Sequence, residues 1–123
     1  MVAKGRVLVI DDDRLLRGIL AEALADDGYD VETAENGLRA LDVLNRWAPD
    51  LILLDLMMPV MDGPSFRARQ LSLDGLSEVP VLILSAARDA PEQSERLGAQ
   101  GCIAKPFDLG VVLDTIARLI HHA

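Results

Sequence analysis

Three short runs of mostly apolar residues constrain the fold more than any other feature of the sequence. They are RVLVI at 6–10, LILL at 51–54 and VLIL at 81–84. Because these runs are continuous rather than alternating, each indicates a strand that is covered on both faces, as in parallel sheets. Two weaker strands are predicted at 30–34, where DVETA alternates like an edge strand, and at 101–104, where the sequence is GCIA.

The first two intervals between these strands have helical patterns. In residues 14–28, Gly28 is positioned to end a helix, and Asn36 can cap a second helix within 37–48 that Pro49 cannot continue. A third helix is predicted to start near Pro64, although its apolar pattern is loose. The predicted core faces of the first two helices comprise Leu16, Ile19, Leu20, Ala23 and Leu24, and then Leu38, Leu41 and Leu44.

A fourth helix is predicted between residues 89 and 98. Asp89 would cap it, Pro91 lies just inside, Glu92 has the spacing of a capping box, and Gly98 follows the end. Its apolar face is thin, which predicts a loosely held helix. The last helix is predicted to run from about residue 109, after Asp108. Its core face comprises Val112, Leu113, Ile116, Leu119 and Ile120, and His121 and His122 are interpreted as a helix-end tail rather than metal ligands.

The alternation of strands and helices predicts the fold class. Five β–α units joined by right-handed crossovers give an α/β, doubly wound, three-layer sandwich around a parallel five-stranded sheet. The chain of 123 residues is expected to form a single domain over 1–123, with one substantial core. In such folds, ligands bind beyond the carboxyl ends of the strands.

Charge and cysteine content exclude several classes of function. A formal net charge of −8 with no basic patch argues against direct binding to nucleic acid or to an anionic membrane. A single cysteine, Cys102, excludes an internal disulfide and a thiolate zinc cage, and it fits a reducing cytoplasm. We find neither a signal peptide nor an apolar run near the roughly 20 residues of a membrane span. A cytoplasmic location is therefore expected.

Chemically capable side chains follow four of the predicted strands. The first strand ends in DDD at 11–13, the third in Asp55 and the fourth in Ser85, and Lys105 follows the fifth. Taken singly, Asp13 is interpreted as a helix cap, and Ser85 and Lys105 have ordinary structural explanations. Because parallel strands place their carboxyl ends at one edge of a sheet, all four stretches are expected to meet there.

The motifs at these strand ends carry a family resemblance. VIDDD at 9–13, DLMMPVMDG at 55–63, ILSA at 83–86 and KPF at 105–107 occur in the order and at the spacing of receiver domains of two-component response regulators. The chain resembles that family over essentially its full length. The resemblance implies a flavodoxin-like sheet of order 2-1-3-4-5 and a signalling role in which the chain catalyses only its own phosphorylation and dephosphorylation.

The resemblance also implies residue roles. Asp55 would accept a phosphoryl group from the phosphohistidine of a sensor histidine kinase or a histidine phosphotransfer protein. A Mg²⁺ or Mn²⁺ ion would be held by carboxylates of Asp12 and Asp55, by Asp11 mainly through water, and by the backbone carbonyl of Met57. Such cations prefer oxygen ligands, and phosphoryl transfer depends mostly on positioning and on neutralising charge near the transferring oxygens.

Two further residues complete the implied phosphoryl site. Lys105 is expected to pair with Asp55 at rest and with a phosphoryl oxygen afterwards, and the Lys105–Pro106 peptide is expected to be cis. Ser85 would donate a hydrogen bond to the new phosphoryl group. The movement of Ser85 and Lys105 toward Asp55 would carry the loop after the fourth strand and shift the fourth helix. The resemblance implies that this remodels the face made by the fourth helix, the fifth strand and the last helix, and so signals to a downstream protein target or a detached output domain.

This sequence departs from the family pattern at one position. The family usually has Tyr or Phe three residues before the lysine, whereas this chain has Cys102. We interpret Cys102 as a small strand hydrophobe rather than a redox sensor, and we expect output to rely on loop and helix movement. Met57 and Ala87, which flank the path of a hydrolytic water, cannot hydrogen-bond it through their side chains, which predicts slow self-dephosphorylation.

Three other classes of protein share part of this pattern with a phosphorylated receiver. A flavodoxin would share the fold, but DDD after the first strand would repel a flavin phosphate. A haloacid-dehalogenase-type phosphatase would need a second acid where Met57 stands. The strongest rival is a degenerate receiver that acts as a phosphorylation-independent interaction module. No output domain follows the last predicted helix, so a stand-alone receiver or one excised from a longer protein is expected.

Overall fold

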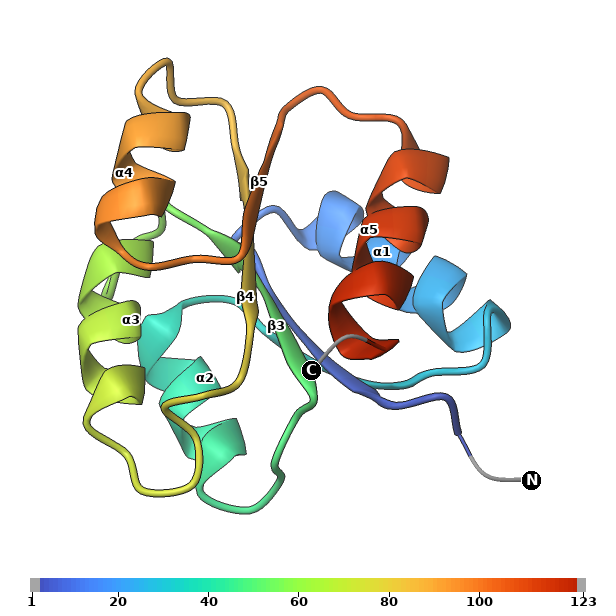
Figure 1. The fold of residues 1–123 in the computed structure, drawn as a ribbon, viewed down its shortest axis with the longest axis horizontal. Helices are drawn as coiled ribbons and strands as arrows, with labels where there is room; N and C mark the ends of the chain where they lie inside the picture. The colour runs from blue at the N-terminus through green and yellow to red at the C-terminus, as the bar shows by residue number, and fades with distance from the viewer. Residues whose placement is uncertain (1–2, 122–123) are drawn as a thin grey trace.

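The computed structural model describes residues 3–121, with side chains through Ile120, so the side chains of His121 and His122 lie outside the described residues. Strands and helices alternate along the chain as predicted (Figure 1). No helix in this described part is long and apolar enough to cross a bilayer. The strands are β1 (Arg6–Ile10), β2 (Asp30–Ala34), β3 (Leu51–Asp55), β4 (Val81–Ser85) and β5 (Gly101–Ala104). The helices are α1 (Arg14–Asp26), α2 (Gly37–Leu44), α3 (Gly63–Leu71), α4 (Ala90–Arg96) and α5 (Leu109–His121).

The sheet has the order β2-β1-β3-β4-β5, and every neighbouring pair is parallel. The predicted doubly wound order is therefore confirmed. In the register, Ile10 lies opposite Leu54, and Ser85 lies opposite Ala104. The residues that follow β1 and β5 therefore emerge at the same edge of the sheet as Asp55, at the end of β3.

Two apolar cores cover the two faces of the sheet. Figure 1 shows α1 and α5 on one side of the sheet and α2, α3 and α4 on the other. Alternate residues of each central strand enter opposite cores: Val7 and Val9 face α1 and α5, whereas Leu8 and Ile10 face the other three helices. Because both faces are covered, β1, β3 and β4 read as continuous apolar runs, and each fully buried large side chain stabilises the fold by roughly 1.5–3 kcal/mol.

The predicted core faces of α1 and α2 were wrong at one residue each. In α1, Leu20 and Leu24 are fully buried, but Ile19 is 45% exposed. In α2, Ala40, Val43 and Leu44 are buried, but Leu38 is 49% exposed. The first residue of α2, Gly37, explains why this helix is rotated relative to the prediction. The Gly37 N–H donates to the Met61 carbonyl at 3.0 Å, and a Cβ on Gly37 would lie 2.7 Å from Met61 Cγ.

Side-chain caps start most of the helices. Asp13 accepts a hydrogen bond from the Leu16 N–H, Asn36 from the Arg39 N–H, and Asp108 from the Gly110 N–H. The caps predicted at Asp13 and Asn36 are confirmed, whereas the predicted capping box of α4 is wrong. The Asp89 side chain accepts no hydrogen bond from a backbone N–H of the helix, and its Oδ1 instead accepts from Gln93 Nε2 at 2.9 Å. The thin apolar face of α4 is confirmed, because Ala90 and Ser94 are its buried residues.

Candidate functional site

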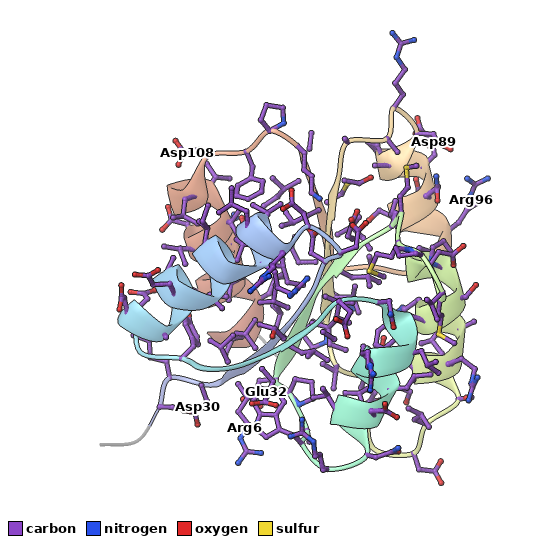
Figure 2. The ribbon with its side chains drawn as sticks, turned by 180° about the vertical axis from the view of Figure 1, so that it is seen from behind. Arg6, Asp30, Glu32, Asp89, Arg96 and Asp108 are labelled. Atoms are coloured by element: carbon purple, nitrogen blue, oxygen red, sulfur yellow. The ribbon has the colours of Figure 1, made fainter. Side chains whose placement is uncertain are left out.

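The carboxyl ends of the strands bring the predicted site residues to one end of the molecule. In Figure 2, Asp89 and Asp108 mark this end, whereas Arg6 and Asp30 lie at the opposite end. Asp11 and Asp12 follow β1, Asp55 ends β3, Ser85 ends β4, and Lys105 follows β5. The register of the sheet therefore positions side chains from four separate stretches of sequence around one site.

Three carboxylates form the acidic part of this site. Oxygen atoms of Asp11, Asp12 and Asp55 all lie within 4.8 Å of one another. Asp11 and Asp55 are 2% and 6% exposed, whereas Asp12 is open to solvent. Two like charges about 4 Å apart repel by about 4 kcal/mol at an effective dielectric constant near 20. A nearby cation is therefore needed to offset this repulsion when all three carboxylates are ionised.

Lys105 supplies one such cation. Its Nζ lies 2.9 Å from Asp11 Oδ2 and 3.5 Å from Asp55 Oδ2. The predicted pairing with Asp55 is present, but the shorter contact with Asp11 was not predicted. Burial alone would lower the pKa of Lys105, but the hydrogen bonds and charges of the two aspartates outweigh it and raise that pKa. The side chain therefore stays an ammonium, and the Lys105–Pro106 peptide is cis, as predicted.

Asp55 has the most perturbed carboxyl of the cluster. Burial is the main cause that raises its pKa from 3.8 to about 6, and the charges of Asp11 and Asp12 add to the rise. Lys105 and the Met57 N–H act in the opposite direction and lower it. A cation bound at these oxygens would favour the ionised form. The protonation state of Asp55 would thus depend on whether a cation is bound at these oxygens.

Hydrogen bonds hold both the carboxylate and the backbone carbonyl of Asp11. Its Oδ1 accepts from the Asp13 N–H at 2.9 Å, and its Oδ2 accepts from Lys105 at 2.9 Å. Arg17 Nη1 donates to the Asp11 carbonyl at 2.7 Å, which ties α1 to the end of β1. The sequence reasoning did not identify Arg17. Its spacing of six residues after Asp11, one turn into the helix, is the available clue.

The loop between β3 and α3 presents backbone rather than side-chain groups to the site. The Met57 N–H lies 3.4 Å from Asp55 Oδ1, while the Met57 side chain is 69% exposed. Because the backbone of Met57 faces the site and its side chain does not, the site does not depend on which side chain residue 57 carries. At the other end of the loop, the Gly63 N–H donates to the Leu56 carbonyl, and a Cβ on Gly63 would lie 2.6 Å from the Asp55 carbonyl oxygen.

The middle of this loop is a strained turn that the sequence reasoning missed. Val60 has a φ of +70°, and the Met61 N–H donates to the Pro59 carbonyl at 2.7 Å. A hydrogen bond from residue i+2 to residue i around a positive φ defines the rare γ-turn, and a β-branched residue is a poor fit to that backbone. Such strain tends to persist where a loop geometry serves function.

The donor set fits a hard divalent cation. It consists of carboxylate oxygens, and a cavity of about 460 Å³ opens beside it. Mg²⁺ prefers oxygen ligands and keeps several waters, for which an open neighbouring cavity leaves room. The lining residues of that cavity are Asp12, Leu56, Met57, Met58, Pro59 and Asp62.

Ser85 lies at the end of β4, and the residue is 1% exposed. Its Oγ accepts a hydrogen bond from the Ala87 N–H at 3.1 Å. Because the hydroxyl acts here as an acceptor, its proton can be donated to another oxygen. In the sheet, Asp55 lies opposite Leu84, so Ser85 is one residue beyond the neighbour of Asp55.

Comparisons with known proteins agree with this geometry. The sequence matches the family described as response regulator receiver domain over residues 7–117. It is 34% identical over 115 residues to sporulation initiation phosphotransferase F of Bacillus subtilis (strain 168), covering 94% of this chain and 93% of that protein. Chemotaxis response regulator CheY4 of Vibrio cholerae matches the structure with a TM-score of 0.86 at 33% identity, covering 97% of this chain and 99% of that one.

Other relatives are longer proteins. Response regulator MprA of Mycobacterium sp. (strain KMS) is 39% identical over 117 residues, which cover 94% of this chain and 50% of that protein. The chain thus spans about half the length of the MprA relatives that it matches.

Proposed function

The chain belongs to the response regulator receiver domain family, and from that premise we propose that Asp55 takes a phosphoryl group from the phosphohistidine of a sensor histidine kinase or a histidine phosphotransfer protein. One observation carries the proposal: Asp55 lies within an acidic cluster whose oxygens are no more than 4.8 Å apart, and its own Oδ2 lies 3.5 Å from Lys105 Nζ. This is the charge arrangement that phosphoryl transfer to a carboxylate requires.

The transfer forms one bond and breaks another. An ionised oxygen of Asp55 attacks phosphorus, the P–O bond of an acyl phosphate forms, and the P–N bond of the donor phosphohistidine breaks. The leaving imidazole keeps the electron pair of that bond. The burial of Asp55 at the end of β3 fixes the attacking atom, and Lys105 stands ready to pair with a phosphoryl oxygen.

Asp12 and Asp55 would hold a Mg²⁺ or Mn²⁺ ion directly, with the Met57 carbonyl as a third protein ligand. Asp11 would act mainly through water, which agrees with its two oxygens already accepting hydrogen bonds. When bound, the ion neutralises charge on the transferring phosphoryl oxygens. Met57 suits a backbone role because its side chain points to solvent.

The phosphoryl group is then reported by Ser85 and Lys105. A phosphoryl group adds about −1.5 to −2 charges and strong acceptor oxygens. The proton of the Ser85 hydroxyl is drawn toward it, which changes the loop that leads into α4. We place the chain, as a single receiver domain over 1–123, in the cytoplasm, where it signals to a downstream protein target or a detached output domain.

A degenerate receiver that binds partners without phosphorylation is the weaker candidate. It would not need an acidic cluster, a paired lysine and a buried strand-end hydroxyl, all of which are present. Slow self-dephosphorylation remains our prediction, because Met57 and Ala87 offer no side-chain hydrogen bond to water.

Acetyl phosphate tests the proposal without a partner protein. Incubation with Mg²⁺ is expected to add the mass of one phosphoryl group to the intact wild type and none to Asp55→Asn. Asp74→Asn, which removes the same charge from an exposed residue between α3 and β4, is the matched control and should be labelled like the wild type. Equal labelling of Asp55→Asn, or none of the wild type, would contradict the proposal.

A further inference from the structure

Helix α3 carries a buried polar network that has no part in the phosphoryl site. Arg67 is 4% exposed and Gln70 is fully buried, and Arg67 Nη1 donates to Gln70 Oε1 at 2.7 Å. Gln70 Nε2 donates in turn to the carbonyls of Leu76 and Val79 in the connection to β4. Within residues 3–121, the guanidinium of Arg67 has no carboxylate partner at ion-pair distance. A buried charge is costly, so its remaining contacts matter.

Those remaining contacts are with the C-terminal end of α4. Arg67 Nε donates to the Leu97 carbonyl at 3.0 Å, and Nη2 donates to the Gly98 carbonyl at 3.1 Å. Cations are favourable at a helix C-terminus, where carbonyl groups lack partners within the helix. The guanidinium therefore binds α4 to α3 at that end.

The same end of α4 is also fixed by its own backbone. Gly98 has a φ of +67°, its N–H donates to the Glu95 carbonyl, and the Ala99 N–H donates to the Ser94 carbonyl. This is a complete Schellman motif. Residue 100 is then bound to β4 twice, because the Gln100 N–H donates to the Val81 carbonyl and Gln100 Oε1 accepts from the Val81 N–H.

The N-terminal end of α4 is attached differently. Asp89 provides no side-chain cap, and Figure 2 shows it at the outer end of the helix, away from Arg96. The Ala90 N–H donates to the Ala87 carbonyl at 3.2 Å, and the Ala87 N–H donates to Ser85 Oγ at 3.1 Å. These hydrogen bonds run from the start of α4 to the hydroxyl of the proposed phosphoryl site.

We infer that α4 pivots about its C-terminal end, with Arg67 as the positioning residue that holds the pivot. When Ser85 reorients toward a phosphoryl group, its hydrogen bond from Ala87 weakens and the N-terminal end of α4 is released. The end bound by Arg67 and Gln100 keeps its position. The inference rests on the proposed function, and it adds which end of α4 moves and which side chain decides that.

Hydrogen exchange with mass spectrometry tests the pivot. The probe is beryllium trifluoride with Mg²⁺, a phosphoryl mimic that binds carboxylates. In the wild type, the probe is expected to change exchange at residues 87–93 and to leave residues 97–100 unchanged. Arg67→Leu loses both charged hydrogen bonds to the end of α4. In this variant, residues 97–100 should exchange at least tenfold faster without the probe, the size of effect expected from losing even one such bond, and should also respond to the probe.

A matched arginine on the same helix serves as the control. Arg69 is exposed, so Arg69→Leu removes the same charge without touching α4 and should behave as the wild type. Arg67→Lys keeps the charge but cannot bridge two carbonyls with a planar fork, so it should give the Arg67→Leu result in a milder form. It provides the same comparison if Arg67→Leu does not fold.

Three outcomes would overturn the pivot. The first is a probe-induced change in wild-type hydrogen exchange that extends equally over residues 87–100. The second is a probe-induced change that stays confined to residues 87–93 in both Arg67 variants. If acetyl phosphate labels Asp55, either outcome would overturn the pivot and leave the proposed function standing. No response to the probe anywhere, together with no labelling by acetyl phosphate, would overturn the pivot and the proposed function together.

Discussion

At the scale of single residues, Asp55 combines burial with neighbouring negative charge. Its folded pKa of about 6 exceeds the ordinary 3.8, so between these values the folded chain holds a proton that the unfolded chain has lost. Stability must then fall as the pH rises through that window. At neutral pH without metal, the ionised carboxylate costs up to about 3 kcal/mol, since one pKa unit corresponds to about 1.4 kcal/mol.

Asp55→Asn should therefore be more stable than the wild type at pH 7 in EDTA. The gain should shrink as the pH falls below about 6 and be lost once the pH is well below 3.8, where the wild-type carboxyl is protonated in both states. Urea unfolding monitored by circular dichroism at several pH values measures it. Asp74→Asn, which removes the same charge at an exposed position, is the control and should not be stabilised at pH 7 in EDTA. A gain for Asp55→Asn that is independent of pH would contradict the assigned cause.

Val60 stores strain in the loop beside Asp55. A non-glycine residue in the left-handed region costs about 1–3 kcal/mol, and the side chain recovers little because it is 76% exposed. Val60→Gly should stabilise the chain by about 1 kcal/mol after the larger backbone entropy of glycine in the unfolded state is subtracted. Thermal unfolding measures this. Val60→Ala, which keeps a Cβ at positive φ, should gain less, and a less stable Val60→Gly would refute the strain.

The sequence predicted which residues gather at the site but not how they pair. Strand ends and motif spacing were sufficient to identify Asp11, Asp12, Asp55 and Lys105 as neighbours. That Lys105 approaches Asp11 more closely than Asp55 depends on differences of less than 1 Å. Such differences are set by packing around the whole site, and no sequence pattern encodes them.

At the scale of elements, strands were predicted better than helix faces. β3 and β4 each extend one residue beyond the predicted run, to include Asp55 and Ser85. Continuous apolar runs leave little freedom, whereas a helix can rotate by a residue, which is why Leu38 was predicted to be buried and is exposed. The loose apolar pattern of α3 has a specific cause: two polar residues, Arg67 and Gln70, occupy its buried face.

The start of α3 is pressed against the end of β3 at Gly63. A methyl group there would meet the Asp55 carbonyl oxygen at 2.6 Å and Leu56 Cα at 2.8 Å. Gly63→Ala should destabilise the fold by about 1–3 kcal/mol, the usual cost of overpacking, and slow labelling by acetyl phosphate. Chemical unfolding and intact-mass kinetics measure the two effects.

Gly18 in the middle of α1 gives the matched comparison. A Cβ at Gly18 meets no atom within 4 Å, so Gly18→Ala should stabilise the chain by about 0.5–1 kcal/mol through helix propensity. Equal effects of the two substitutions would show that close packing at Gly63 is not what matters.

At the scale of the whole molecule, a metal ion bound at the acidic cluster as proposed would couple metal binding to folding. A ligand that binds the folded chain alone raises its stability by mass action, by about 2.7 kcal/mol at one hundred times the dissociation constant. Mg²⁺ should therefore raise the melting temperature of the wild type, and the rise should be smaller for Asp12→Asn. Without metal, Asp12→Asn should be slightly more stable than the wild type. If neither the addition of Mg²⁺ nor the Asp12→Asn substitution alters the melting temperature, the proposed metal site is contradicted.

The proposed function requires that one carboxylate, Asp55, becomes an acyl phosphate. After incubation with acetyl phosphate and Mg²⁺, borohydride reduction converts a phosphorylated aspartate to homoserine, and peptide mass spectrometry identifies its position. We expect homoserine at residue 55 and unchanged aspartate at 11, 12 and 13. Homoserine at any of those three positions, or at none of the four, would contradict it.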